Sequence, residues 1–167
     1  FLSPLINFSG TWRFDDELRD ALSEIRRLRG VPYMLRRLLS AMERVVRIEQ
    51  TSMARIVAYG TPVLLASSKA VYELDREPHE WHVALPIPWN RLCETYRAWI
   101  EEETNTLVYV HEYSATQRSV RRVVKDTTGA RVSFSATLEE RSPHAAGEWR
   151  AVYRGKGFAF RLSESYA

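Results

Sequence analysis

The sequence is poor in cysteine: Cys93 is the only one among its 167 residues. A single cysteine excludes an internal disulfide and favours a reducing compartment. No apolar run approaches the roughly 20 residues that a membrane-spanning helix needs. We therefore expect an intracellular, cytoplasmic protein. Because the chain begins with Phe1, an organelle reached through a lost targeting peptide stays open as an alternative.

Sequence motifs for catalysis and metal binding are also lacking. The chain has no Gly-x-Ser-x-Gly turn, no glycine-rich phosphate loop and no Cys–His pair spaced like a nucleophilic site. His79 and His82 fall on opposite faces of a strand, so they cannot share a metal ion without a turn. Haem ligation through His111 is the remaining cofactor alternative. We predict no enzyme activity, no metal and no cofactor.

Lysine is scarce, so nearly all basic side chains are arginine; the lysines are Lys69, Lys125 and Lys156. The 24 basic residues exceed the 21 acidic ones by a net charge of +3, and the two kinds are interleaved along the chain. This scatter argues against nucleic acid as a partner. Arginine pairs well with carboxylates and phosphates, so an anionic ligand or partner surface is compatible, as is a set of solvated arginines.

Two helices are predicted near the amino end. Asp15 or Asp16 can cap the first, and Leu18, Leu22 and Ile25 recur at helical spacing. Gly30 ends that helix, and Pro32 stands near the first turn of the next. The pattern predicts a helix-turn-helix over about residues 15–43.

From Arg44 onward the apolar period changes to two. With an initial strand at 8–14, the strand-like segments are 45–51, 54–59, 68–74, 80–85, 91–101, 106–114, 118–125, 131–139 and 148–154. The segment 85–90 contains two prolines and is interpreted as an irregular edge or loop. No linker or repeat divides the chain. We predict a mainly β fold and one domain over residues 1–167, an up-and-down antiparallel β-barrel of about ten strands with a helical lid.

Three stretches carry a resemblance to a known family. They are Phe8-Ser9-Gly10-Thr11-Trp12, the segment Gly30–Arg37 that opens with Gly-Val and ends in a basic pair, and the paired strands over Cys93–Tyr113. In these the chain resembles the intracellular lipid-binding proteins, which include the fatty-acid- and retinoid-binding proteins of the calycin superfamily of lipocalin-like barrels. The resemblance implies non-covalent binding and transport of a small hydrophobic or amphipathic ligand, fatty-acid-like or retinoid-like, inside the barrel.

The resemblance also implies a polar anchor for that ligand. Family members hold a carboxylate with an arginine two residues before a tyrosine on the last strand and with an arginine on an earlier strand. Tyr153 matches the tyrosine, but Ala151 stands where the first arginine is expected. Arg122 matches the earlier-strand arginine. A register slip of one residue would exchange it for its neighbour Arg121.

An apolar lining is expected around such an anchor. Our candidates, for which plain core packing is the alternative, are Met34, Leu38, Tyr59, Tyr72, Trp81, Trp99 and Tyr109.

Basic residues concentrate on the expected lid, at Arg26, Arg27, Arg36 and Arg37. The resemblance implies docking at an anionic membrane surface, and an acidic protein partner or an ordinary solvated helix face are the alternatives. A second hypothesis for the whole chain is a ligand-free barrel that serves as an accessory subunit of a larger protein assembly. An exposed apolar patch at Ile87 and Trp89 would favour it.

Overall fold

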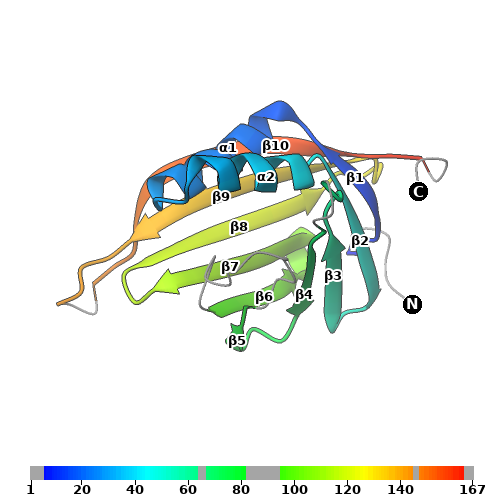
Figure 1. Cartoon of the computed structure of the whole chain (residues 1–167). Coiled ribbons are helices and arrows are strands. Elements are labelled where there is room, and N and C mark those ends of the chain that lie inside the picture. Colours follow the sequence, from blue (N-terminus) through cyan, green and yellow to red (C-terminus); the bar gives the residue numbers. More distant parts are fainter. Residues whose placement is uncertain (1–5, 64–66, 82–94, 145–146, 164–167) are drawn as a thin grey trace.

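The structure, a computed structural model, describes residues 6–63, 67–81, 95–144 and 147–163. Within these ranges the chain forms two helices and one antiparallel sheet (Figure 1). The helices are α1 (Asp16–Leu28) and α2 (Tyr33–Met42), and a short 3₁₀ turn spans Glu102–Thr104. The strands are β1 (Gly10–Phe14), β2 (Val45–Ser52), β3 (Arg55–Tyr59), β4 (Lys69–Glu73), β5 (His79–Glu80), β6 (Thr95–Glu101), β7 (Thr106–Ser114), β8 (Gln117–Lys125), β9 (Arg131–Glu140) and β10 (Arg150–Arg161).

The strand order is β4-β3-β2-β1-β10-β9-β8-β7-β6-β5. Among the described residues, consecutive strands pair as antiparallel neighbours except β4 and β5, and β10 returns to pair with β1. The sheet therefore has the predicted up-and-down barrel topology, and in the described residues it is not closed: β4 and β5 stand at the two ends of the strand order. The helix-turn-helix predicted over residues 15–43 is confirmed at its predicted place.

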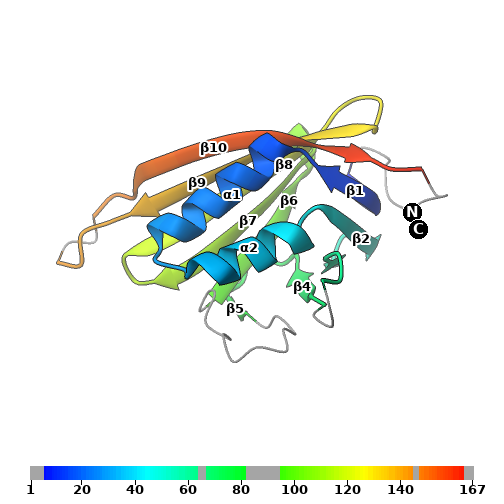
Figure 2. The same ribbon diagram turned by 45° about the horizontal axis from the view of Figure 1, so that its top comes forward.

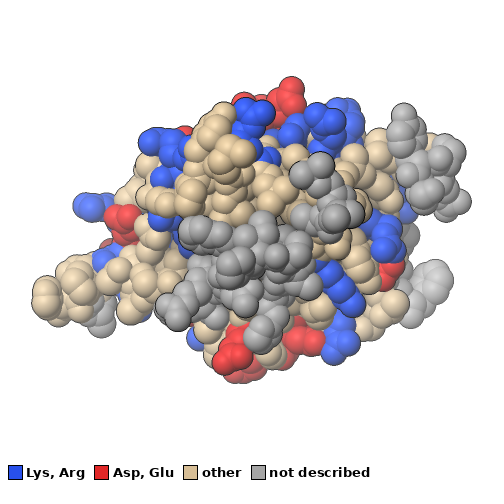
Figure 3. All heavy atoms as spheres, viewed as in Figure 1, with Lys and Arg blue, Asp and Glu red and all other residues tan. Residues whose placement is uncertain are grey.

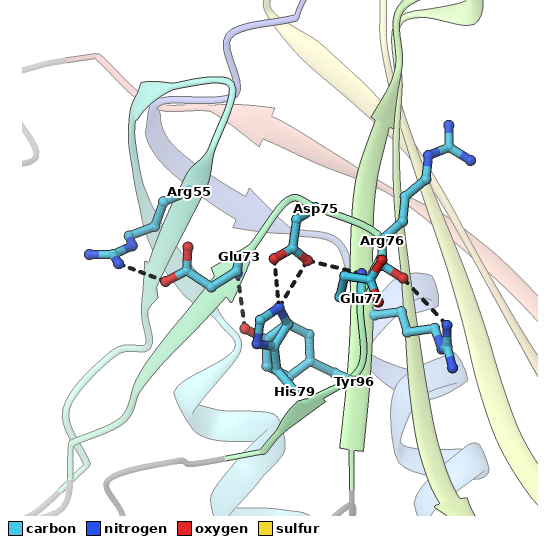
Figure 4. Close-up of polar contacts among 8 residues, drawn as sticks. Arg55, Glu73, Asp75, Arg76, Glu77, His79 and Tyr96 are labelled. Atoms are coloured by element: carbon cyan, nitrogen blue, oxygen red, sulfur yellow. Dashed lines mark hydrogen bonds and ion pairs between the residues drawn. The ribbon is translucent and has the colours of Figure 1, made fainter.

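The turn between β4 and β5 spans the opening between these edges (Figure 4). The backbone N–H of Glu73 donates to the Tyr96 hydroxyl at 2.9 Å, and that of Arg76 donates to the carbonyl of Ala98 at 3.1 Å. His79 lies 2.9 Å from both carboxylate oxygens of Asp75, and this hydrogen bond is the main cause that lowers the pKa of Asp75. Side chains and turn backbone thus join β4 to β6 where no strand ladder does so in the described residues.

Helix α1 begins at a capped turn that also fixes it to the sheet. The Asp15 carboxylate accepts a hydrogen bond from the backbone N–H of Leu18 at 2.8 Å and another from that of Phe158 on β10 at 3.1 Å. Its acidic first turn and basic last turn suit the helix dipole. Gly30, with a φ of +79°, ends the helix in a conformation that glycine adopts without strain.

Helix α1 lies directly along β10, as Figure 2 shows. Two glycines make this close approach possible. A Cβ atom at Gly157 would stand 2.4 Å from the backbone nitrogen of Leu18, and one at Gly155 would stand 2.4 Å from the Cβ of Ala21. No side chain fits in either place.

The hydrophobic core fills the space between α1 and the inner faces of β1 and β8–β10. Its members include Trp12, Leu18, Leu22, Ile25 and Phe134, all nearly inaccessible to solvent. The Trp12 indole N–H donates to the carbonyl of Phe8 at 3.0 Å, so this buried donor is satisfied. The core occupies only part of the interior, and the rest is open.

The last strand differs most from its predicted bounds. β10 continues to Arg161 because Ala159 and Phe160 pair with both β9 and β1. The segment 85–90 and the patch at Ile87 and Trp89 lie outside the described residues. No helix in the described ranges is long and apolar enough to cross a membrane.

Candidate ligand cavity

A cavity lies between the helices and the inner face of the sheet. The cavity has a volume of about 220 Å³. Its walls are mostly apolar side chains from both helices and most strands, such as Leu22, Leu39, Met42, Ile56 and Val123. An interior of this kind can hold an apolar ligand, because a ligand that enters it leaves water behind.

One part of the cavity wall is a cluster of aromatic rings. We call Tyr72, Trp81, Tyr109, His111 and Tyr113 the ring cluster; all five line the cavity. The ring centroids of Tyr72 and Tyr109 are 5.2 Å apart, and those of Trp81 and His111 are 4.6 Å apart. These separations are typical of favourable aromatic pairs.

His111 is the buried polar member of the ring cluster. Its Nε2 lies 3.1 Å from the Tyr72 hydroxyl, and its side chain is almost fully enclosed. Burial, together with the positive charges of Arg121, Arg29 and Arg26, holds the pKa of His111 well below its ordinary value. The imidazole is therefore neutral at neutral pH.

Arg121 brings a full positive charge into the cavity. The residue is only 8% exposed, and its Nε has no hydrogen-bond partner in the described structure. Its guanidinium carbon lies 5.6 Å from the ring centroid of Tyr109, which faces it across the β7–β8 ladder. None of the carboxylates in the described ranges forms an ion pair with Arg121. An arginine keeps its charge even when buried, so this site favours an anion.

The phenol of Tyr109 completes the polar surroundings of Arg121. Burial raises the pKa of Tyr109, and the nearby guanidinium offsets only part of that effect. The hydroxyl therefore keeps its proton at neutral pH and can donate a hydrogen bond to a bound anion.

Two contacts lie beside the cavity, one between α1 and the end of α2 and one between the end of α1 and β7. Arg26 binds the carboxylate of Glu43 through both terminal nitrogens, at 2.5 and 2.7 Å. The guanidinium carbon of Arg29 lies 3.3 Å from the ring centroid of Tyr113. Arg26, Arg29 and Glu43 all line the cavity, so they form its charged rim.

The predicted anchor residue Arg122 points away from the cavity. Its side chain is half exposed and pairs with Glu101 at 3.3 Å. On β8 the alternation of faces directs Arg121 inward and Arg122 outward, so the predicted inward face of Arg122 is wrong by one residue.

Tyr153 packs against the hydrophobic core but does not line the cavity. Burial raises the pKa of its hydroxyl, and the charges of Glu24 and Asp20 act in the same direction. The β9–β10 register shifts between Ala151 and Tyr153, yet Arg150 remains exposed. Among the described residues, β8 therefore places an arginine in the cavity wall and β10 places none.

The predicted lining residues divide into two groups. Tyr72, Trp81 and Tyr109 do line the cavity. The others are outside the described lining: Met34, Leu38, Tyr59 and Trp99.

The helical period of α2 and the alternation of faces on β3 and β6 explain why these four side chains lie outside the described lining. Leu35 and Leu39 form the buried face of α2, which leaves Met34 76% exposed and Leu38 at the edge. Tyr59 lies on the outer face of β3, where the Arg47 guanidinium carbon is 4.1 Å from its ring centroid. Ala98 faces inward on β6, so its neighbour Trp99 points to the outer face, where the Arg76 guanidinium lies over its ring.

The four predicted lid arginines have different surroundings. Arg26 turns inward to Glu43, and Arg27 pairs with Glu24 on the helix surface. Arg36 and Arg37 lie over the ring of Tyr33. They line a polar groove between the helices together with Arg19 and Arg44, among others.

The sequence pattern named Arg121 only as the alternative to Arg122 after a register slip, it did not indicate Tyr113 or Arg29 as cavity residues, and it indicated His111 only for haem. The inward face of β8 had a usable signal, because Ser119, Arg121, Val123 and Lys125 alternate with exposed residues such as Arg122. Arg29 follows the last turn of α1, and its contact with Tyr113 depends on the placement of the helix. The described residues hold no group of three or more His, Cys, Asp or Glu side chains placed to bind a metal ion.

Comparisons with known proteins agree with this geometry at the level of the fold. No family model and no curated protein matches the chain. Among solved structures, the chain is similar to apo lipid binding protein 8 of Caenorhabditis elegans, with a TM-score of 0.55 and 14% sequence identity. The likeness covers 93% of this chain and 95% of that one. The chain therefore has the fold of a lipid-binding protein of the intracellular type, as the sequence resemblance predicts.

Proposed function

We propose that this protein binds a small hydrophobic or amphipathic ligand in its cavity and carries it without any covalent step. The observation that carries the proposal is Arg121, a charged side chain that is enclosed in an apolar cavity and lacks a carboxylate partner in the described structure. A ligand with an anionic end would pair with that charge, and its apolar part would lie against the cavity wall.

The free energy for binding would come mainly from the apolar part of the ligand. Each buried CH₂ group contributes about 0.8 kcal/mol. The anion at Arg121 would then select among ligands of similar size, because it relieves a buried charge that neutral ligands leave unpaired. Fatty-acid-like and retinoid-like acids both meet these two requirements.

A carrier also has to meet the membranes or proteins that supply its ligand. Basic side chains gather over the two helices, along the upper side of the view in Figure 3. The groove between the helices, lined by Arg19, Arg36, Arg37 and Arg44, is the surface we propose for approach to an anionic membrane. The lone cysteine is compatible with a reducing, cytoplasmic setting for such a carrier.

Native mass spectrometry after extraction with organic solvent, combined with displacement of a fluorescent fatty-acid analogue, tests the proposal. We expect a co-purifying small molecule or a saturable probe site in the wild-type protein. Arg121→Gln should weaken the anionic probe about tenfold or more, while Arg122→Gln, at the paired surface arginine, should leave it unchanged. No extracted ligand and no probe binding would contradict the carrier function.

A further inference from the structure

The ring cluster occupies the part of the cavity nearest the buried charge. Tyr109 lies under Arg121, and its centroid is 5.2 Å from Tyr72 and 5.5 Å from His111. Trp81 extends the same group, with its centroid 5.2 Å from Tyr72. The atoms of a ligand closest to its anionic group would therefore meet ring faces and edges rather than aliphatic side chains.

Hydrogen bonds fix the orientation of two tyrosine rings in the ring cluster. The Tyr72 hydroxyl is held by His111, and the Tyr113 hydroxyl lies 2.7 Å from the Ser119 hydroxyl. These contacts hold the rings in place before any ligand arrives. A preorganised aromatic wall favours a planar ligand, because such a ligand loses little conformational freedom when it binds.

The size of the cavity points in the same direction. The volume of about 220 Å³ is below the roughly 300–1,000 Å³ of pockets that hold drug-sized ligands. A compact molecule fills such a space. A long flexible acyl chain would have to widen the cavity or leave part of itself outside.

We propose that the preferred ligand is a compact aromatic acid, with its ring against the ring cluster and its carboxylate on Arg121. This inference rests on the proposed binding function and names the chemical class within it. The carboxylate would take the open Nε–H side of Arg121, with the Tyr109 hydroxyl as a further donor. The fused or single ring would then stack against Tyr109, Tyr72 and Trp81.

Two acids with the same number of carbon atoms separate this class from saturated lipids. Isothermal titration calorimetry of the full chain would compare 2-naphthoate with undecanoate. Two aromatic contacts correspond to about tenfold in affinity, so we expect 2-naphthoate to bind about tenfold more tightly. The uncharged analogue 2-naphthamide should bind at least tenfold more weakly than 2-naphthoate, because it leaves Arg121 unpaired.

A variant tests the contribution of the ring itself. Tyr109→Leu keeps an apolar side chain but removes the ring and its hydroxyl. The loss of the hydroxyl donor should weaken both acids by a similar factor, and the loss of the ring should cancel most of the preference for 2-naphthoate over undecanoate. Tyr59→Leu, on the outer face of β3, is the matched control and should change neither affinity. The wild-type comparison remains decisive if Tyr109→Leu fails to fold.

The outcomes separate this inference from the function on which it rests. Equal affinities, or tighter binding of undecanoate, would overturn the aromatic-acid class and leave the carrier function standing. A preference for 2-naphthoate that persists in Tyr109→Leu would overturn the role of the ring cluster. Binding of neither acid, nor of the fluorescent fatty-acid analogue, would overturn both.

Discussion

Arg121 and Tyr109 face each other as directly paired residues of β8 and β7, with the guanidinium carbon 5.6 Å from the ring centroid. The inner face of β8 carries two basic residues, Arg121 and Lys125, and this pair places the first of them beside an aromatic wall. In an unliganded protein such a charge is unfavourable, because it has left water without gaining a carboxylate.

Replacing the buried charge should stabilise the unliganded protein. Arg121→Met keeps much of the side-chain length and removes the cost of desolvation, so we expect the free energy of unfolding to rise by about 1–3 kcal/mol. Urea denaturation measures this change. The control Arg122→Met breaks only the exposed pair with Glu101 and should stay within about 0.5 kcal/mol of the wild type. A large loss of stability in Arg121→Met would mean that the charge is structural.

The glycine contact under α1 should tolerate no side chain. Gly157→Ala forces a Cβ atom against the backbone of Leu18, so the helix must move, and we expect a loss of about 1–3 kcal/mol in the free energy of unfolding. Lys156→Ala, exposed on the same strand, is the control and should change stability by less than about 0.5 kcal/mol. Thermal and urea unfolding check both. Equal stability of the two variants would contradict the close packing of α1 on β10.

His111 should make stability depend on pH below neutrality. Because burial lowers the pKa of His111 in the folded state, the unfolded chain binds the proton first as the pH falls. Stability is therefore complete above the ordinary histidine pKa of about 6.5. It falls by up to about 1.4 kcal/mol per pH unit below that value until the folded-state pKa is reached.

Urea denaturation at pH 7 and pH 5.5 of the wild type and of His111→Gln isolates this effect. The carboxylates titrate in both proteins, so their contribution cancels in the comparison. We expect the wild type to lose about 1 kcal/mol more than the variant over this range. Identical losses in the two proteins would show that His111 is not enclosed as the structure has it.

The inner ion pair of the lid should contribute more than the outer one. Arg26 and Glu43 have side chains only 11% and 18% exposed, whereas Arg27 and Glu24 are 56% and 33% exposed. Glu43→Gln leaves Arg26 without its charge partner in a low-dielectric setting, so a loss of about 2–4 kcal/mol is expected. Glu24→Gln should change stability much less, because water screens that exposed pair. Comparable losses by denaturant titration would count against a buried contact at the cavity rim.

Much of the fold could be predicted because local signals agree with one another. Asp15, the apolar spacing of α1 and Gly30 define the first helix without any knowledge of the barrel. The period-two segments likewise define most strands. The sequence pattern ends β10 at residue 154, because Gly155 and Gly157 add no apolar side chain to the alternation, although the contact with α1 requires both.

The site was harder to predict because it depends on which face of a strand turns inward. Arg121 and Arg122 are chemically identical neighbours, so only the register of β8 against β7 and β9 decides between them. Tyr59 and Trp99 were assigned to the interior on side-chain type alone, and alternation places both outside. How much of the interior is cavity depends on the curvature of the sheet, for which no single residue carries a signal.

Calorimetric comparison of undecanoate with undecanol, in the wild type and in Arg121→Met, tests the central claim most directly. The two ligands share their apolar chain and differ in the charged group alone. We expect the wild type to bind the carboxylate at least about tenfold more tightly than the alcohol, and Arg121→Met to lose that preference. A carboxylate preference of the same size in Arg121→Met, or none in the wild type, would contradict an anionic ligand held by the buried arginine.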